Sequence, residues 1–274
     1  MENRCTGEKL DVRGRSADFY PYEKDKIVKL FLKEISREEI DIECENTIEA
    51  FRTGCTAMQC YGEIEFDGRI GIILDRVNGI PMTKLPEKNP LSLFTCSKML
   101  AEQHLIVHSK HSNKLRDVRK VAVDFLSNKA MDILTDEEKA KAKTYIESLP
   151  EGDTVLHLDF HTENILVDNG KCVAIDWLTA ARGHHEVEVA QMQFLFHDSL
   201  LFPGCSKFQL MLYSTLRSFI YNGYIKRYKK ATGVDLNEVK KWKIVPLIIR
   251  RCVWAHEFET EPLTRQIKEC LAAI

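Results

Sequence analysis

Hydrophobic and polar residues alternate over most of the first eighty or so positions, which is the period of β-strands. Residues 8 to 31 alternate and turn like a hairpin. They include "KLDVRGRSADFYPY", with Gly14 near its centre, and then "DKIVKLF", which has strand composition. Two further strand-like runs, "TAMQCYGEIEF" and "RIGIILDRV", flank Asp67 and Gly68, a pair typical of a hairpin turn. The pattern predicts an antiparallel sheet.

One segment within this region has the period of a helix instead. Between Ser36 and Thr53 the apolar residues recur at helical spacing. Ser36 with Glu39 is a capping-box signature, in which each residue satisfies a free backbone N–H of the other. Gly54 suits the position after the helix, where a left-handed conformation is common. We therefore expect a single helix beside the sheet.

The character of the chain changes after "NGIPMTKLPEKNP", which is rich in glycine, proline and asparagine and predicts a linker. Amphipathic helical patterns follow at 94–108, 115–128 and 136–148, and they dominate again from His185 onward. We therefore predict an α+β fold of two lobes. An N-terminal lobe, residues 1–78, would contain the antiparallel sheet and one helix, and a mostly helical C-terminal lobe would comprise residues 79–274.

Composition narrows the functional classes. The 274 residues carry a formal net charge of -2, which argues against a nucleic-acid-binding protein. No apolar run is long enough for a membrane span, and the first residues lack the apolar core of a secretory signal. The nine cysteines are scattered without a CxxC motif, as expected in a reducing compartment. We expect a cytoplasmic protein, with no membrane association and no protein partner implied.

The strongest chemical signal is "HLDFHTENILVDNGKCVAIDW", residues 157–177. The spacing H-x-D-x-x-x-x-N at its start is the catalytic-loop pattern of kinases and contains Asp159 and Asn164. Asp176 follows within the same stretch. The segment between the last two predicts a hairpin that folds Asp176 back toward Asn164. In phosphoryl transfer, such an Asp orients the attacking hydroxyl, while oxygen ligands hold the magnesium that neutralises phosphate charge.

A kinase needs further groups in the N-terminal lobe. A hairpin that covers the phosphates could be "GRSADFY", although it has only Gly14 as its glycine. A strand lysine should follow, and Lys29 is favoured over Lys26 because it lies within the apolar run. The alternative is an exposed strand lysine.

A helix glutamate should pair with that lysine. Glu43 and Glu45 are both candidates, with Glu39 a distant third. A last strand should then present backbone groups to the purine, and "IILDRVNG" ends at the lobe junction, as required. Each signal alone is weak, but all four occur in the expected order.

Taken together, "LPEGDTVLHLDFHTENILV" and "VAIDW" resemble the aminoglycoside phosphotransferase and choline kinase-like superfamily. The similarity extends over nearly the whole chain, and "ECENTIEAFRTG" resembles the family helix in a way that selects Glu43 over Glu45. The resemblance implies a protein-kinase-like fold, ATP (possibly GTP) with Mg²⁺ as cofactors, and a small molecule with a hydroxyl group as acceptor.

The resemblance also implies a role for individual residues. Asp159 would be the catalytic base, and Asn164 and Asp176 would hold the metal. Lys29 would bind phosphate and be oriented by Glu43. The remaining nucleotide contacts would come from the loop and the lobe junction, namely Gly14, Ser16, Asp75 and Val77.

Two departures from the family pattern stand out. The usual glycine between His and Asp is Leu158 here, which is expected to alter the backbone of the catalytic loop. Downstream, where the family often has G-D-P-x-x-D-L-A, this chain has "GHHEVEVA". Glu188 would take the place of the second Asp, whereas His184 replaces the first.

Two other functions remain open. A protein kinase would carry an activation segment that ends in A-P-E, which is absent from this sequence. A catalytically inactive nucleotide-binding regulatory protein would keep the fold without the reaction. The acceptor itself is open: Glu257, Glu259 and Glu261 would suit a cationic aminoglycoside or choline-like amine, but a solvated acidic loop is the more probable interpretation, and sugars or amino sugars fit equally well.

Overall fold

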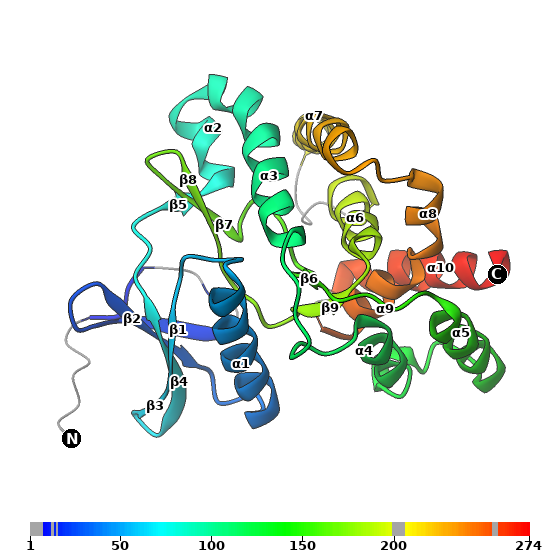
Figure 1. Ribbon diagram of the computed structural model, residues 1–274, viewed down its shortest axis with the longest axis horizontal. Helices are drawn as coiled ribbons and strands as arrows, with labels where there is room; N and C mark the ends of the chain where they lie inside the picture. Colours follow the sequence, from blue (N-terminus) through cyan, green and yellow to red (C-terminus); the bar gives the residue numbers. More distant parts are fainter. Residues whose placement is uncertain (1–7, 12–13, 15, 199–205, 254–256) are drawn as a thin grey trace.

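The computed structural model describes residues 8–11, 14, 16–198, 206–253 and 257–274. Its N-terminal part is a four-stranded antiparallel sheet with the order β1-β2-β4-β3, covered by helix α1 (Figure 1). The bounds are β1 Ala17–Tyr22, β2 Lys26–Phe31, α1 Arg37–Thr53, β3 Cys60–Phe66 and β4 Arg69–Asp75. The predicted sheet with one helix is confirmed, and the rest of the molecule is mostly helical.

Strand β2 lies inside this sheet, so its inward side chains are buried. Lys29 pairs with Phe19 of β1 and with Ile72 of β4, and its side chain is only 7% exposed. The turn that joins β1 to β2 lies at residues 23–25. Gly14 lies before β1, where the N–H of Leu10 donates to the carbonyl of Phe19. The centre of the sheet therefore presents a lysine to one face.

Helix α1 begins and ends where the sequence predicts. The Ser36 hydroxyl accepts from the N–H of Glu39 at 3.2 Å, and the Glu39 carboxylate accepts from the N–H of Ser36 at 3.0 Å. Gly54 ends the helix with φ +79°, a conformation that glycine adopts without strain. Ile40 and Cys44 pack against the sheet in a separate small core. These caps fix the position of α1, which carries Glu43.

The segment predicted to be a linker is structured. Residues Ile80–Pro81 form β5, which pairs with β7 in a second sheet of order β5-β7-β8. Short helices follow at Met82–Lys84, Leu85–Lys88 (α2) and Pro90–Ser92, and Met82 is fully buried. The linker prediction was therefore wrong in part, because β5 is an edge strand, where a proline can be accommodated.

The remaining strands and helices build the C-terminal part. The strands are β6 Thr154–Leu156, β7 Ile165–Asp168, β8 Lys171–Ala174 and β9 Ala181–Gly183. The helices are α3 Leu93–His108, α4 Val118–Phe125, α5 Asp136–Ser148, α6 His185–Gln193, α7 Lys207–Thr232, α8 Leu236–Lys241, α9 Ile244–Val253 and α10 Glu257–Ala273. A 3₁₀ helix at Lys129–Met131 and a π-helix at Phe194–Asp198 complete the element order.

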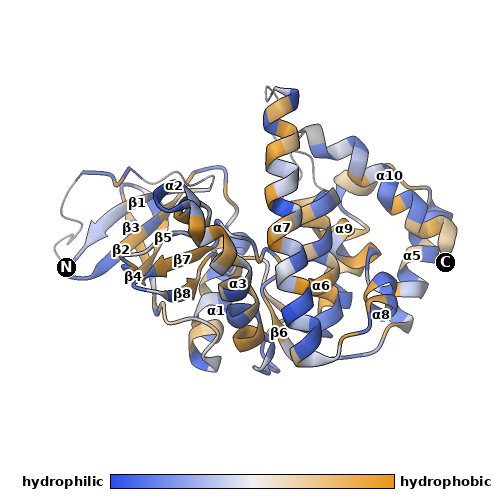
Figure 2. Ribbon diagram, turned by 90° about the horizontal axis from the view of Figure 1, so that it is seen from above, coloured by the Kyte–Doolittle hydropathy of each residue, from blue (hydrophilic) through white to orange (hydrophobic). Residues whose placement is uncertain are grey.

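A large hydrophobic core joins these helices to the short strands. Helix α3 packs against α7, and α9 packs against α4, α6 and α10. Figure 2 shows β7 and α9 as strongly hydrophobic stretches, with the sheet-rich part and the helical part side by side. Of the helices in the described ranges, none combines the length and hydropathy needed to cross a membrane. The hairpin β7-β8 contacts this helical part through β8 and α3.

Candidate active site

The loop between β6 and β7 carries the H-x-D-x-x-x-x-N motif. Side chains of helix α6 form hydrogen bonds with the backbone of this loop. Leu158 adopts the left-handed conformation with φ +59° and is fully buried. Its N–H donates to Glu188 Oε1 at 2.6 Å, and its carbonyl accepts from Gln191 Nε2 at 2.5 Å. A glycine would adopt this left-handed conformation without strain, and here a leucine adopts it. That Leu158 alters the loop relative to the family pattern stays a prediction.

Because of this conformation, we expect a glycine at position 158 to give a more stable protein than an alanine, the reverse of the order in a helix or strand. We expect Leu158→Ala to destabilise the fold by about 2–5 kcal/mol, since a buried side chain is lost. Leu158→Gly should be about 1–2 kcal/mol more stable than Leu158→Ala, because glycine avoids the strain of a left-handed residue. Urea unfolding of the two variants measures the difference. A glycine variant less stable than the alanine variant, as in an ordinary helix or strand, would contradict this account of the loop.

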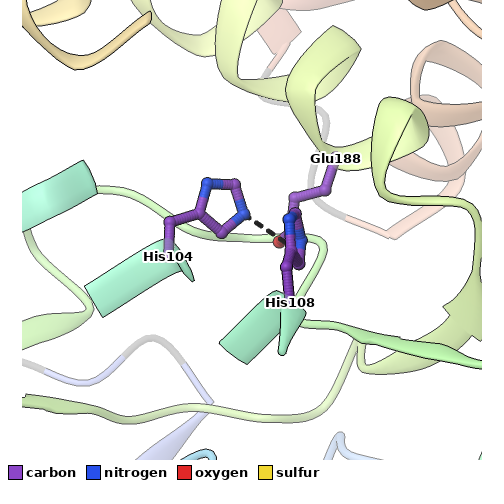
Figure 3. A group of neighbouring side chains, drawn as sticks. All are labelled: His104, His108 and Glu188. Atoms are coloured by element: carbon purple, nitrogen blue, oxygen red, sulfur yellow. Dashed lines mark hydrogen bonds and ion pairs between the residues drawn. The ribbon is translucent and has the colours of Figure 1, made fainter. Parts of the chain in front are cut away.

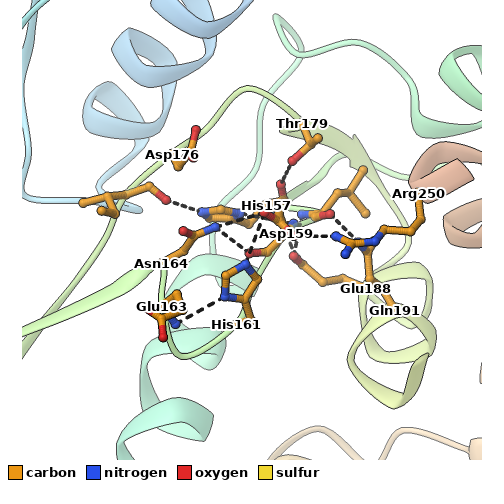
Figure 4. A network of polar contacts seen from close by, with 12 residues as sticks. His157, Asp159, His161, Glu163, Asn164, Asp176, Thr179, Glu188, Gln191 and Arg250 are labelled. Carbon is orange, nitrogen blue, oxygen red and sulfur yellow. Dashed lines mark hydrogen bonds and ion pairs between the residues drawn. The ribbon is translucent and has the colours of Figure 1, made fainter. Parts of the chain in front are cut away.

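Asp159 follows directly and lies between two cationic groups. Its Oδ2 is 3.3 Å from His161 Nε2, and its Oδ1 is 3.7 Å from Arg250 Nη1 of α9 (Figure 4). Burial alone would raise the pKa of Asp159, but His161 and Arg250 outweigh it and lower the pKa to about 2. The carboxylate is therefore ionised at neutral pH. Buried Oδ1 makes no hydrogen bond within the described residues, so it can still accept one from a hydroxyl.

His157 links the catalytic loop to the strand that precedes Asp176. Its Nε2 lies 2.9 Å from the carbonyl of Ile175, and its Nδ1 accepts from the N–H of Asp159 at 3.3 Å. These bonds assign the Nε2–H tautomer, and the ring also packs against Trp177 at 4.5 Å between centroids. Because one imidazole contacts both segments, it fixes Asp159 relative to Asp176.

Asn164 comes directly before β7 and Asp176 comes shortly after β8, so both lie at the open end of the β7-β8 hairpin and offer oxygen atoms there. Asn164 Nδ2 donates to the backbone carbonyl of Asp159 at 3.0 Å and to its carboxylate at 3.1 Å. This orientation leaves the amide carbonyl oxygen for another partner. Asp176 has φ +67°, which aspartate tolerates, and its side chain is partly exposed. Carboxylate and amide oxygens are ligands that Mg²⁺ prefers, so these two residues fit the predicted metal.

Lys29 joins the two parts of the molecule at this point. Its Nζ lies 2.5 Å from Glu43 Oε1 and 3.3 Å from Asp176 Oδ1. Burial lowers the pKa of Lys29, but the carboxylates of Asp176 and Glu43 more than compensate, so the ammonium stays charged. Of the other candidates, Glu45 is exposed on α1, and Lys26 is instead 3.4 Å from Glu23.

Asn46, which the sequence analysis did not identify, forms a second link from α1. It lies one turn after Glu43, and its Nδ2 is within 3.0–3.2 Å of the carbonyls of Trp177, Leu178 and Ala180. Its signal in the sequence was only a polar residue on the buried side of the predicted helix. The segment that follows Asp176 is therefore attached to α1 through Asn46, one turn away from the Glu43 that contacts Lys29.

The predicted nucleotide contacts lie at the loop before β1 and at the end of β4. A Cβ atom on Gly14 would lie 2.6 Å from the carbonyl oxygen of Ala17, so this position excludes a side chain. The carbonyl of Ser16 accepts from the N–H of Leu32. The N–H of Asp75 donates to the carbonyl of Gln59, and Val77 lies in the irregular segment after β4. Their contact with a nucleotide stays a prediction.

The two altered positions of the downstream motif differ in their contacts. Glu188 is fully buried and accepts from the N–H groups of both His157 and Leu158, so it holds the catalytic loop. His184 is the N-cap residue of α6 and stacks on Trp242, with ring centroids 5.7 Å apart.

The three clustered glutamates lie in a helix and not in the loop that the sequence suggested. They lie at the start of α10, and Glu259 is only 3% exposed. Its carboxylate accepts two hydrogen bonds from Arg250 Nη2, at 2.9 and 3.1 Å. The side chain of Glu257 lies outside the described residues. That expectation was wrong for Glu259, because a buried arginine pairs with it beside Asp159.

His161 makes stability depend on pH near the site. Burial lowers the pKa of His161, but the Asp159 carboxylate outweighs this and raises it above its usual value. A raised folded-state pKa contributes stability below the unfolded value of about 6.5, and that stability is lost as pH rises through the folded value. We expect His161→Gln to destabilise the protein more at about pH 5 than at about pH 9. Urea unfolding at both values measures this, and an equal loss would contradict the pairing.

Comparison with solved structures identifies the fold. A mutant aminoglycoside phosphotransferase APH(4)-Ia, bound to ADP and hygromycin B, aligns with a TM-score of 0.66 at 14% identity, over 97% of this chain and 93% of that one. The chain has the fold of the aminoglycoside phosphotransferase and choline kinase-like superfamily. No family model matches the sequence, and no curated protein matches it.

Two further proteins whose solved structures have this fold are named as kinases of other small molecules. The choline kinase LicA of Streptococcus pneumoniae aligns with a TM-score of 0.59 at 14% identity, over 97% of this chain and 95% of that one. The amicoumacin kinase hAmiN, crystallised with AMP-PNP and Ca²⁺, aligns with a TM-score of 0.56 at 11% identity, over 97% and 88%. The three structures described here are thus named as phosphotransferases or kinases of different small molecules.

Proposed function

We propose that this protein transfers the γ-phosphate of ATP, or of GTP, to a hydroxyl group of a small molecule in the cytoplasm. The observation that carries the proposal is the convergence of five side chains from distant segments of the chain. Glu43 contacts Lys29, Lys29 contacts Asp176, and Asn164 contacts Asp159, all through side chains. This set matches, in type and order, the parts that phosphoryl transfer requires.

In the proposed reaction, Lys29 binds a phosphate oxygen and Glu43 keeps its ammonium in place. Mg²⁺, held by Asn164 and Asp176, would neutralise charge on the phosphates. Asp159 orients the acceptor hydroxyl through Oδ1 for in-line attack on the γ-phosphate and takes its proton. Because its pKa is lowered to about 2, Asp159 is ionised at neutral pH and can accept a hydrogen bond from the acceptor hydroxyl.

We further propose that residues 1–78 form the nucleotide lobe and residues 79–274 the acceptor lobe. The nucleotide would lie under the loop of Gly14 and Ser16, with its purine at the backbone of Asp75 and Val77. The relatives crystallised with ADP and with AMP-PNP support nucleotide binding by this fold. Their acceptors are small molecules, which supports a small-molecule acceptor here.

The two alternatives have less support. The short distance along the chain from Asp176 to α6, which begins at His185, leaves little room for a peptide-binding segment. The inactive regulatory protein was suggested by Leu158, but the left-handed backbone at this position keeps Asp159 in a loop held by Glu188. Neither departure from the family pattern removes a group that the reaction needs.

Magnesium-dependent turnover of ATP tests the proposal. Purified protein should hydrolyse or transfer phosphate from ATP when presented with aminoglycosides, amino sugars, sugars and choline-like alcohols. A thermal-shift screen of the same compounds with an ATP analogue would identify the acceptor class, since a ligand that binds only the folded state raises the melting temperature. ATP binding without any transfer or hydrolysis over the whole panel would favour the regulatory alternative.

A further inference from the structure

Beneath the catalytic loop, two histidines and a glutamate converge in the interior of the protein (Figure 3). His104 and His108 lie one turn apart on α3, and Glu188 faces them from α6. Glu188 Oε2 is 2.8 Å from His108 Nε2 and 3.3 Å from His104 Nε2. The side chains of His104 and Glu188 are completely buried, and that of His108 is 4% exposed. Such a concentration of polar nitrogen and oxygen atoms in a core requires a physical reason.

The opposite nitrogen of each imidazole contacts a tyrosine hydroxyl. His104 Nδ1 is 2.7 Å from the hydroxyl of Tyr224, and His108 Nδ1 is 2.6 Å from that of Tyr228. The two tyrosines are also one turn apart, on α7, which packs against α3. Both rings are therefore oriented so that their Nε2 atoms point toward Glu188. His104 Nε2 is buried and makes no hydrogen bond within the described residues, so one nitrogen remains available.

The donor atoms also suit a bound cation. His104 and His108 each offer an imidazole nitrogen and Glu188 offers a carboxylate oxygen, and these atoms all lie within 4.8 Å of one another. Two imidazoles and a carboxylate are a common ligand set for zinc in proteins.

We propose that His104, His108 and Glu188 form a binding site for a zinc-type divalent transition-metal ion. The ligand atoms of a tetrahedral zinc site lie about 3.3 Å apart, given bonds of about 2.0–2.1 Å to nitrogen and oxygen. The two distances to Glu188 Oε2, 2.8 and 3.3 Å, are close to this spacing. Imidazole nitrogens suit zinc and its neighbours, whereas Mg²⁺ prefers oxygen. This site is therefore distinct from the one at Asn164 and Asp176.

The tyrosines then have a clear role. A histidine that binds a metal through Nε2 usually donates its Nδ1–H to an outer group, which fixes the ring and strengthens the ligand. Tyr224 and Tyr228 supply these outer groups. The ion would connect α3 to α6 through Glu188, which also accepts from the N–H of Leu158. We infer that the metal stabilises the base on which the catalytic loop rests.

The test uses tag-free protein, stripped with a chelator and never exposed to a nickel column. Wild-type protein should bind one equivalent of Zn²⁺ in competition with a chromophoric chelator, and Co²⁺ in its place should give the intense visible bands of a tetrahedral complex. His104→Gln and His108→Gln should lose this binding. His111→Gln is the matched control, because it removes an exposed histidine that contacts only Asp153 among the ionic partners described. It should bind zinc as wild type does.

A second variant tests whether the cluster of His104, His108 and Glu188 is a metal site or only a buried hydrogen-bond network. Tyr224→Phe keeps all three ligands but removes an outer contact, so we expect zinc affinity to fall roughly 10- to 100-fold. Wild-type protein that takes up no zinc, or gives only octahedral cobalt bands, would overturn the proposal even if the glutamine variants fail to fold. So would equal zinc binding by the His104→Gln and His111→Gln variants. None of these measurements depends on phosphate transfer.

Discussion

Asp159→Asn is expected to lower phosphate transfer roughly 10²- to 10⁴-fold while ATP binding stays near that of wild type. The amide has nearly the same shape as the carboxylate but cannot take the proton of the acceptor hydroxyl. Asp159 has no contact with Lys29 or Asp176 in the described structure. Its contact with Asn164 can be kept, because Asn164 also donates to the backbone carbonyl of residue 159 and the new amide oxygen can still accept. Turnover with the acceptor found in the screen, together with calorimetry of ATP binding, measures the two effects separately.

A control for this variant lies in the same hairpin. Asp168 is at the turn of β7-β8 and contacts Asn169, far from the groups that the reaction needs. Asp168→Asn removes one negative charge in the same way and should leave turnover unchanged. Wild-type turnover by Asp159→Asn would refute its assignment as the residue that faces the acceptor.

Asp176→Asn, unlike Asp159→Asn, should weaken the binding of ATP itself when Mg²⁺ is present. Asparagine tolerates the left-handed backbone at φ +67° as aspartate does, so the turn is kept and only the charge is lost. We expect the gain in ATP affinity that magnesium confers to fall by at least roughly 10- to 100-fold, since a proposed ligand loses its charge.

Calorimetry of ATP binding with and without magnesium measures this effect. The Asp168→Asn variant again serves as the reference for loss of one charge. If ATP affinity of Asp176→Asn depends on magnesium as strongly as in wild type, Asp176 does not hold the metal. A variant that binds normally but transfers slowly would instead assign Asp176 to the chemical step.

Local features of this chain were predictable from the sequence because short-range physics determines them. The capping box of Ser36 and Glu39 and the glycine after α1 depend only on neighbours in the chain. The β7-β8 hairpin likewise follows from the turn residues between two short apolar runs. Among the glutamates, residue patterns left Glu43 and Glu45 open, since both lie on the same helix. Only packing distinguishes the buried one from the exposed one.

The groups that surround Asp159 could not be derived in this way. Arg250 is on a helix near the end of the chain and reaches Asp159 only because α9 packs in the core. The pair His104 and His108 has the spacing of metal ligands on a helix, but its third member, Glu188, lies 80 positions after His108. The division of the chain at residue 78, and the role of each nucleotide contact, stay predictions.

The attachment of α1 has a consequence for control of the activity. Many protein kinases are switched on when the helix that carries the paired glutamate moves inward. Here Glu43 already contacts Lys29, and Asn46 bonds to three carbonyls just after Asp176, so an outward movement would break buried contacts at two successive turns of the helix. On the proposed function, the enzyme is assembled in its working state as soon as it folds. Its output would then be set by the amount of protein and the supply of acceptor, with no phosphorylation or activating subunit required.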